Sequence, residues 1–311
     1  MKKVYFSLED DIVNPCWDNV FKAMFTKETP DSRGALSKFL SAVINEETAV
    51  ISITANEPPA DDLRGRQIRY DITCKFNDGR AANVEMTVSP DKCELIRMEY
   101  YEARLFSSHD MRGAEKTYDS LPHTYQISII VERPVVDDDV IIHHFRYYDA
   151  ESRVSLNGRT HIITLELSKL ARLAEKSAKD MTPLERWASF LLYTADKGKR
   201  KLVNEILEIE EGVSMAGAVL LTISKDEVER ARLESEYKYA VDYQSRMITA
   251  RQEGEAIGEA RGVAIGEARG VELAYRAAIK GGVSGEILEQ IAKNSGISSE
   301  RADKIRSEET R

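Results

Sequence analysis

Two acidic residues, Asp71 and Glu85, are the side chains that this sequence is best able to bring together for chemistry. Both lie in the stretch 67–88, QIRYDITCKFNDGRAANVEMTV, where apolar and polar residues alternate on either side of the turn residues 77–79. A three-residue loop with Gly79 at positive φ keeps the two apolar faces together and places Asp71 opposite Glu85. Directly opposed side chains have Cβ atoms about 4.5–5.5 Å apart, and like charges placed so repel each other. A divalent cation between them, typically Mg²⁺, would remove that repulsion.

A second interpretation is that both carboxylates lie on a solvated face of the sheet. Arg69, Lys75 or Arg80 would then dilute the repulsion, and charged residues on an exposed strand face are common. The alternation alone allows both the metal pair and the solvated face.

A helix is predicted on the N-terminal side of this hairpin. It begins at Asn14 and Pro15, a capping side chain followed by a proline at the first helical position. Asp18 and Lys22 lie off its apolar stripe, one turn apart, where a surface ion pair is the simplest interpretation.

A second helix is predicted after the hairpin, from Ser89-Pro90 to about residue 108. Its residues Arg97, Tyr101 and Arg104 are spaced by four and three, so they share one face of the helix. Packing of these long side chains over the sheet is one interpretation of that face, and a functional role is the other.

Four further strands are predicted, at 50–54, 125–131, 140–147 and 161–167. The segment 125–131, YQISIIV, is apolar on both faces, which is typical of a central strand covered on both sides. Strands and helices that alternate in this way predict an α/β fold with a mixed sheet.

The chain is predicted to be helical from residue 168 onward. Glycine recurs every four residues from 254 to 270, inside the repeat IGEARGVA, IGEARGVE. Each glycine costs a helix about 1 kcal/mol relative to alanine, so the segment is either a fraying linker helix or a close helix–helix contact that makes a homo-oligomer. Two short helices are predicted at the end of the chain, with Gly296 in the turn between them. They form either a docking hairpin or a weak DNA-binding helix-turn-helix.

The composition is that of a folded protein with a core. Of the 311 residues, 42% are hydrophobic and 31% are charged, and the net charge of −9 argues mildly against a nucleic-acid binder. Three cysteines without metal-binding spacing fit a reducing cytoplasm. No signal peptide and no apolar stretch long enough for a membrane span is found in the sequence, so no membrane partner is expected.

Several short motifs, taken in order, resemble the core of the PD-(D/E)XK nuclease superfamily. The resemblance is closest to the PD-(D/E)XK nuclease family transposases, also called recombination-promoting nucleases, and it covers most of the chain. The segments that carry it are Asp18-Asn-Val-Phe21-Lys22 with Phe25, Tyr70-Asp71-Ile72, Asp78-Gly79, Asn83-Val84-Glu85-Met86, Arg97, Tyr100-Tyr101, Tyr118, Ile127-Ser-Ile129, Leu165-Glu166-Leu167 and Trp187, followed by the charged, glycine-rich tail.

The resemblance implies a restriction-endonuclease-like α/β fold, a mixed sheet flanked by helices and followed by a helical C-terminal region and tail. It also implies a metal-dependent DNA endonuclease linked to recombination or mobile DNA. Mg²⁺ or Mn²⁺ would be held by Asp71, Glu85 and the Met86 carbonyl, with Asp18 completing the metal shell. Arg97 and Tyr101 would brace the phosphate of the DNA.

One position departs from the family pattern. The third motif residue is usually Lys or Gln, and here it is Thr87. A hydroxyl carries no positive charge and reaches less far than an amide, so Thr87 is expected to orient the attacking water and the activity to be weakened. The alternative is a non-catalytic protein that keeps the nuclease fold and binds itself or another protein.

Four segments are expected along the chain. Residues 1–168 form the nuclease-like core, and 169–223 form a helical extension that packs on it. Residues 224–275 form the long helix with the glycine repeat, and 276–311 form the small helical hairpin.

Overall fold

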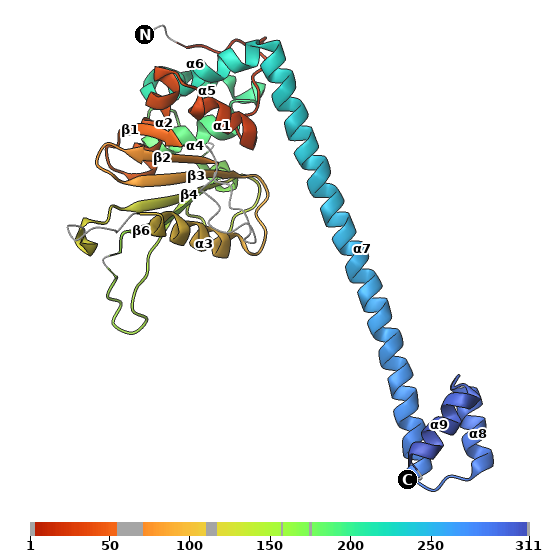
Figure 1. Cartoon of the computed structure of the whole chain (residues 1–311). Helices are drawn as coiled ribbons and strands as arrows, with labels where there is room; N and C mark the ends of the chain where they lie inside the picture. Colours follow the sequence, from red (N-terminus) through yellow and green to blue (C-terminus); the bar gives the residue numbers. More distant parts are fainter. Residues whose placement is uncertain (1–3, 55–70, 110–116, 157, 174–175, 310–311) are drawn as a thin grey trace. The chain divides into compact units, whose positions relative to one another are not determined.

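The computed structural model of the chain describes residues 4–54, 71–109, 117–156, 158–173 and 176–309 (Figure 1). Residues 67–70 of the predicted hairpin, Arg69 among them, lie outside the described residues.

The centre of the fold is a six-stranded sheet with the strand order β1-β2-β3-β4-β6-β5. Strands β1, β2 and β3 pair antiparallel, β3, β4 and β6 pair parallel, and β5 closes the edge antiparallel to β6. The sheet is therefore mixed, as predicted. The strands are β1 Val50–Thr54, β2 Ile72–Phe76, β3 Ala81–Thr87, β4 Thr124–Ile130, β5 Ile142–Phe145 and β6 Thr160–Glu166. Every residue of β4 is buried, which confirms the predicted central strand.

Helices cover both faces of this sheet. On one face α1 packs against β2 and β3 and α2 against β1, while α4, α5 and α6 pack behind α2. On the other face α3 packs against β4 and β6 (Figure 1). These helices are α1 Asp18–Thr26, α2 Pro30–Ile44, α3 Glu94–Ser107, α4 Pro183–Tyr193, α5 Arg200–Ile209 and α6 Glu211–Lys225. The arrangement is consistent with a restriction-endonuclease-like α/β fold.

The hairpin of β2 and β3 has the predicted register. Its pairs run from Lys75 opposite Ala81 out to Ile72 opposite Val84, so the next step outward places Asp71 opposite Glu85. Gly79 ends the three-residue loop with φ +88°. That left-handed conformation favours glycine.

Two predicted helix starts, at Asn14-Pro15 and at Ser89-Pro90, are wrong by a few residues. The Asn14 side chain accepts a hydrogen bond from the Cys16 N–H at 2.9 Å, and the Asp91 side chain accepts one from the Cys93 N–H at 2.6 Å. Each side chain therefore closes a local turn rather than capping a helix. Helix α1 begins at Asp18 and α3 at Glu94.

The described chain divides into two compact units, residues 1–238 and 239–311. Helix α7, Glu227–Lys280, begins in the first unit and continues into the second. Helices α8 (Gly285–Asn294) and α9 (Ser299–Glu309) form the predicted hairpin, with Gly296 at φ +72° between them, and pack around the buried Tyr275. The four segments expected from the sequence stay a prediction.

None of the helices in the described ranges combines the length and the apolar character that crossing a bilayer requires.

Candidate functional site

Glu85 lies in the layer between strand β3 and helix α3. Its neighbours Val84 and Met86 point into the main hydrophobic core, so strand alternation turns Asn83, Glu85 and Thr87 to the opposite face. Glu85 is only 4% exposed and Asn83 is fully buried. The solvated-face interpretation is therefore wrong for Glu85.

The Glu85 carboxylate is held by a neutral amide and approached by a cation. Asn83 Nδ2 donates to Glu85 Oε1 at 3.1 Å and to Gln126 Oε1 at 2.8 Å, and Arg97 Nη2 lies 3.8 Å from Glu85 Oε2. Burial, followed by the charge of Asp71, raises the pKa of Glu85 to about 8, against the opposing effect of Arg97. The site therefore favours protonation of Glu85 unless a cation binds there.

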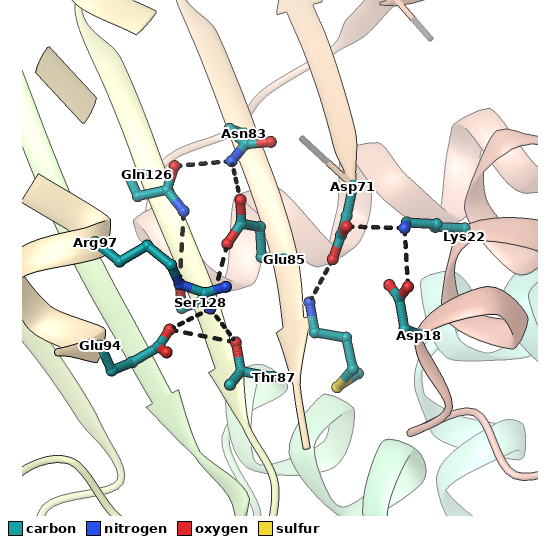
Figure 2. Close-up of polar contacts among 11 residues, drawn as sticks. Asp18, Lys22, Asp71, Asn83, Glu85, Thr87, Glu94, Arg97, Gln126 and Ser128 are labelled. Atoms are coloured by element: carbon teal, nitrogen blue, oxygen red, sulfur yellow. Dashed lines mark hydrogen bonds and ion pairs between the residues drawn. The ribbon is translucent and has the colours of Figure 1, made fainter. Parts of the chain in front are cut away.

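Thr87 lies beside the same guanidinium. Arg97 Nη2 donates to Glu94 Oε1 at 2.7 Å and to Thr87 Oγ1 at 3.1 Å, and Thr87 Oγ1 donates to Glu94 Oε1 at 3.3 Å (Figure 2). The Arg97 guanidinium also lies 5.8 Å from the centre of the Tyr101 ring. The positive charge that the motif position lacks is thus supplied next to it by α3.

Asp71 belongs to a second group, formed with helix α1. Lys22 Nζ lies 2.8 Å from Asp71 Oδ1 and 2.8 Å from Asp18 Oδ2, so it bridges the two carboxylates. The Met86 N–H donates to Asp71 Oδ2 at 3.2 Å. No hydrogen bond or ion pair joins Asp71 to Glu85 among the residues drawn in Figure 2.

The two carboxylates of this group influence each other through charge. Burial, followed by the charge of Asp71, raises the pKa of Asp18 to about 7, while Lys22 opposes the rise. The Asp18 side chain as a whole is 46% exposed, so solvent screens part of this effect, although its Oδ1 atom is buried and has no hydrogen-bond partner in the described part of the chain. Burial alone would lower the pKa of Lys22, but the charges of Asp71 and Asp18 outweigh it and raise that pKa.

The donor chemistry of Asp71, Glu85 and Asp18 fits a hard divalent cation. Such ions prefer carboxylate oxygens, and the pKa values of Glu85 and Asp18 are raised partly because negative charge accumulates here without enough compensation. Within the described ranges, no three His, Cys, Asp or Glu side chains already gather in a metal-binding group. These residues therefore have the donor chemistry for a divalent ion, while in this structure Asp71 is paired with Lys22.

The structure adds residues that the sequence patterns missed. Lys22 was paired only with Asp18, because helical spacing reveals neighbours within one helix and not contacts to a strand. Glu94 and Glu102 take buried positions on α3, together with Met98 and Leu105. Their spacing of four, four and three residues is the signal that could have placed both glutamates on the buried face.

The comparison with protein families supports the motif analysis. A family model described as PD-(D/E)XK nuclease family transposase matches residues 15–250, which include every residue of the two groups described above. No curated protein and no solved structure gives a significant match to the chain.

Proposed function

The chain belongs to the PD-(D/E)XK nuclease family transposases, and from that premise we propose that it is a metal-dependent DNA endonuclease linked to recombination or mobile DNA. The observation that carries the proposal is Glu85, which is buried at 4% exposure and lies one step beyond the last hairpin pair, Ile72 with Val84, where the register sets it opposite Asp71. A buried carboxylate opposite a second one is costly unless a cation compensates them.

Asp71 and Glu85 are the proposed ligands of Mg²⁺ or Mn²⁺, with the Met86 carbonyl beside them and Asp18 as a candidate third carboxylate. When bound, the divalent ion supplies a water of lowered pKa and neutralises charge on the phosphate. The chain's own residues orient the reactants. Asn83 fixes the Glu85 carboxylate through its 3.1 Å hydrogen bond.

Arg97 is the proposed contact to the phosphate. Its side chain is 42% exposed although it donates to the buried Glu94, so one end is anchored while solvent, or a DNA backbone, reaches the rest. Tyr101 packs beside it. Thr87 shares a hydrogen bond with the same guanidinium, and we propose that its hydroxyl orients the attacking water less effectively than the usual Lys or Gln.

The test is cleavage of supercoiled plasmid in the presence of Mg²⁺ or Mn²⁺. The wild type should nick or linearise the plasmid, and Asp71→Asn and Glu85→Gln, which keep size and remove charge, should each lose this activity. Asp78→Asn, in the exposed turn of the same hairpin, is the matched control and should retain it. Cleavage that persists in both Asp71→Asn and Glu85→Gln would contradict the proposed site.

If the wild type does not cleave the plasmid, Thr87→Gln is the next variant to test. Cleavage by Thr87→Gln would identify a nuclease weakened at that one position. No cleavage by this variant would favour the second candidate function below.

The second candidate function is self-association through α7. Every residue from 238 to 270 is exposed, and apolar or small residues recur at alternating intervals of three and four, which is typical of a coiled-coil seam. The members of this seam are Tyr243, Met247, Ala250, Gly254, Ile257, Ala264, Ala268 and Val271, with the charged Arg261 between Ile257 and Ala264. We propose that a second copy of the chain covers it, whether or not the nuclease site is active.

A further inference from the structure

Lys22 is the cation closest to the proposed metal ligand Asp71. Its ammonium nitrogen contacts Asp71 Oδ1 and Asp18 Oδ2, each at 2.8 Å, and its side chain is 30% exposed. Lys22 therefore neutralises the Asp71 carboxylate, which a divalent ion would need as a ligand. It does so from α1, which covers the face of the sheet opposite to α3.

The position of Lys22 is fixed by the packing of α1. The neighbouring residues Val20, Phe21, Met24 and Phe25 are fully buried in the main core, so the helix is anchored against β2 and β3. Asp18, one turn earlier, holds the ammonium on its other side. The packing of α1 and the contact to Asp18 thus hold the Lys22 ammonium next to Asp71.

One oxygen of Asp71 is already committed to the backbone. The Met86 N–H donates to Oδ2 at 3.2 Å, whereas Oδ1 has the Lys22 ammonium as its partner. A metal bound through Oδ1 would have to take the place of the Lys22 ammonium, and one bound through Oδ2, which keeps a second lone pair, would still lie within a few ångströms of that ammonium.

We propose that Lys22 is an internal counter-ion that competes with the divalent metal for Asp71 Oδ1, so that the site takes up metal only by exchange with the lysine. This inference rests on the proposed function, because it assumes that Asp71 is a metal ligand. While Lys22 holds Asp71, the Asp71 and Glu85 carboxylates belong to separate groups (Figure 2). In the exchange Lys22 would keep Asp18 Oδ2 as its partner, which leaves Asp18 Oδ1 as the oxygen of that side chain open to a metal.

The exchange has a measurable consequence for affinity. A positive charge within a few ångströms of a bound divalent ion repels it, and the repulsion at a partly buried site is enough to change a binding constant by at least about ten-fold. Removing the charge at position 22 should therefore tighten metal binding, although it removes two ion pairs from the free protein.

The experiment is a titration of the full chain with Mn²⁺ in the absence of DNA, followed by calorimetry or by the electron paramagnetic resonance of free Mn²⁺. Lys22→Met should lower the Kd at least about ten-fold relative to the wild type, and Lys22→Gln should do the same if the methionine variant folds poorly. Lys22→Arg keeps the charge and should leave the Kd near the wild-type value.

Lys27→Met is the matched control. Lys27 follows the same helix, is also 30% exposed and pairs with one carboxylate, Glu229, at 2.7 Å, so its removal should leave Mn²⁺ affinity unchanged. An unchanged or weaker affinity in both Lys22→Met and Lys22→Gln would overturn the exchange while leaving the proposed nuclease intact. If the wild type and both neutral variants fail to bind Mn²⁺, the metal dependence of the proposed function falls together with the exchange.

Discussion

At the scale of single residues, the cation next to Thr87 comes from helix α3. Arg97 donates to Thr87 Oγ1 and to the buried Glu94, and it also lies 3.8 Å from Glu85. A threonine at the third motif position therefore does not leave this part of the site without positive charge. That charge is attached to a helix rather than to the strand that carries Glu85.

Arg97→Gln should lower the rate of metal-dependent plasmid cleavage by about 10²–10³-fold, the usual effect of removing one group that stabilises charge in a transition state. The loss should appear mainly in kcat. Arg104→Gln, seven residues further along α3 and exposed, is the control and should cleave at the wild-type rate. Equal rates for the two variants would argue that Arg97 serves only to neutralise Glu94.

The register of the hairpin was predictable, and the ion pair between Asp71 and Lys22 was not. Period-two alternation and a glycine loop fix the register of a local hairpin. A contact between residues 22 and 71 depends on how a helix packs against a strand far along the chain, which alternation does not encode. The burial of Glu85 was missed for a similar reason, because α3 covers that face of the sheet only in the folded chain.

At the scale of elements, α3 buries acidic residues where an amphipathic helix usually buries apolar ones. Glu102 is 2% exposed, and burial raises the pKa of its carboxyl to about 7, although the Thr124 hydroxyl and nearby backbone N–H groups oppose the rise. Because the folded pKa lies above the ordinary value of 4.5, the folded protein retains a proton that the unfolded chain releases. Stability is therefore lost as the pH rises from about 4.5 to about 7.

Glu102→Gln removes this titration. The variant should be more stable than the wild type above pH 7, by at most about 3.5 kcal/mol, since one pKa unit corresponds to about 1.4 kcal/mol. Below pH 4.5 the two should have similar free energies of unfolding. Urea denaturation at both pH values checks this, with Glu99→Gln on the exposed side of α3 as the control. An advantage of the same size at both pH values would show that it arises from packing and not from ionisation.

The elements themselves were predicted with different success. Strand β1 has the predicted bounds, because period-two alternation is a local signal. The start of α1 was misplaced because Asn14 closes a turn instead of capping the helix, and α3 begins at Glu94 rather than at the predicted Ser89-Pro90, after a turn closed by Asp91. In sequence these two uses of an Asn or Asp side chain look alike.

At the scale of the whole molecule, the two units differ in what stabilises them. Residues 1–238 share one large core, and the start of α7 is attached to it through the buried Leu233 and the stacking of Trp17 on Tyr237 at 4.3 Å. The described residues of the second unit, 239–309, share the small hydrophobic cluster around Tyr275. The proposed nuclease site lies wholly in the first unit.

A chain that ends at Lys238 should therefore fold and cleave plasmid at the rate of the full chain, and it should be monomeric. The full chain should sediment as an oligomer, since only it carries the exposed seam of α7. Sedimentation velocity over a wide range of concentrations, combined with the cleavage assay, separates the two properties. Monomeric behaviour of both chains would argue against self-association, and loss of cleavage in the short chain would argue that the second unit supports the site.

The exposure of every residue from 238 to 270 also affects how fast their backbone amides exchange with deuterium. Their side chains are all exposed, and nothing lies within 4 Å of the position of a Cβ at any of the five glycines of the segment, so helical hydrogen bonds are the main protection of its backbone amides from solvent deuterium. A lone α7 would exchange these amides quickly, whereas a paired one would exchange them more slowly as the protein becomes more concentrated. The rate at which this helix takes up deuterium thus reports the fraction of chains that are associated through α7.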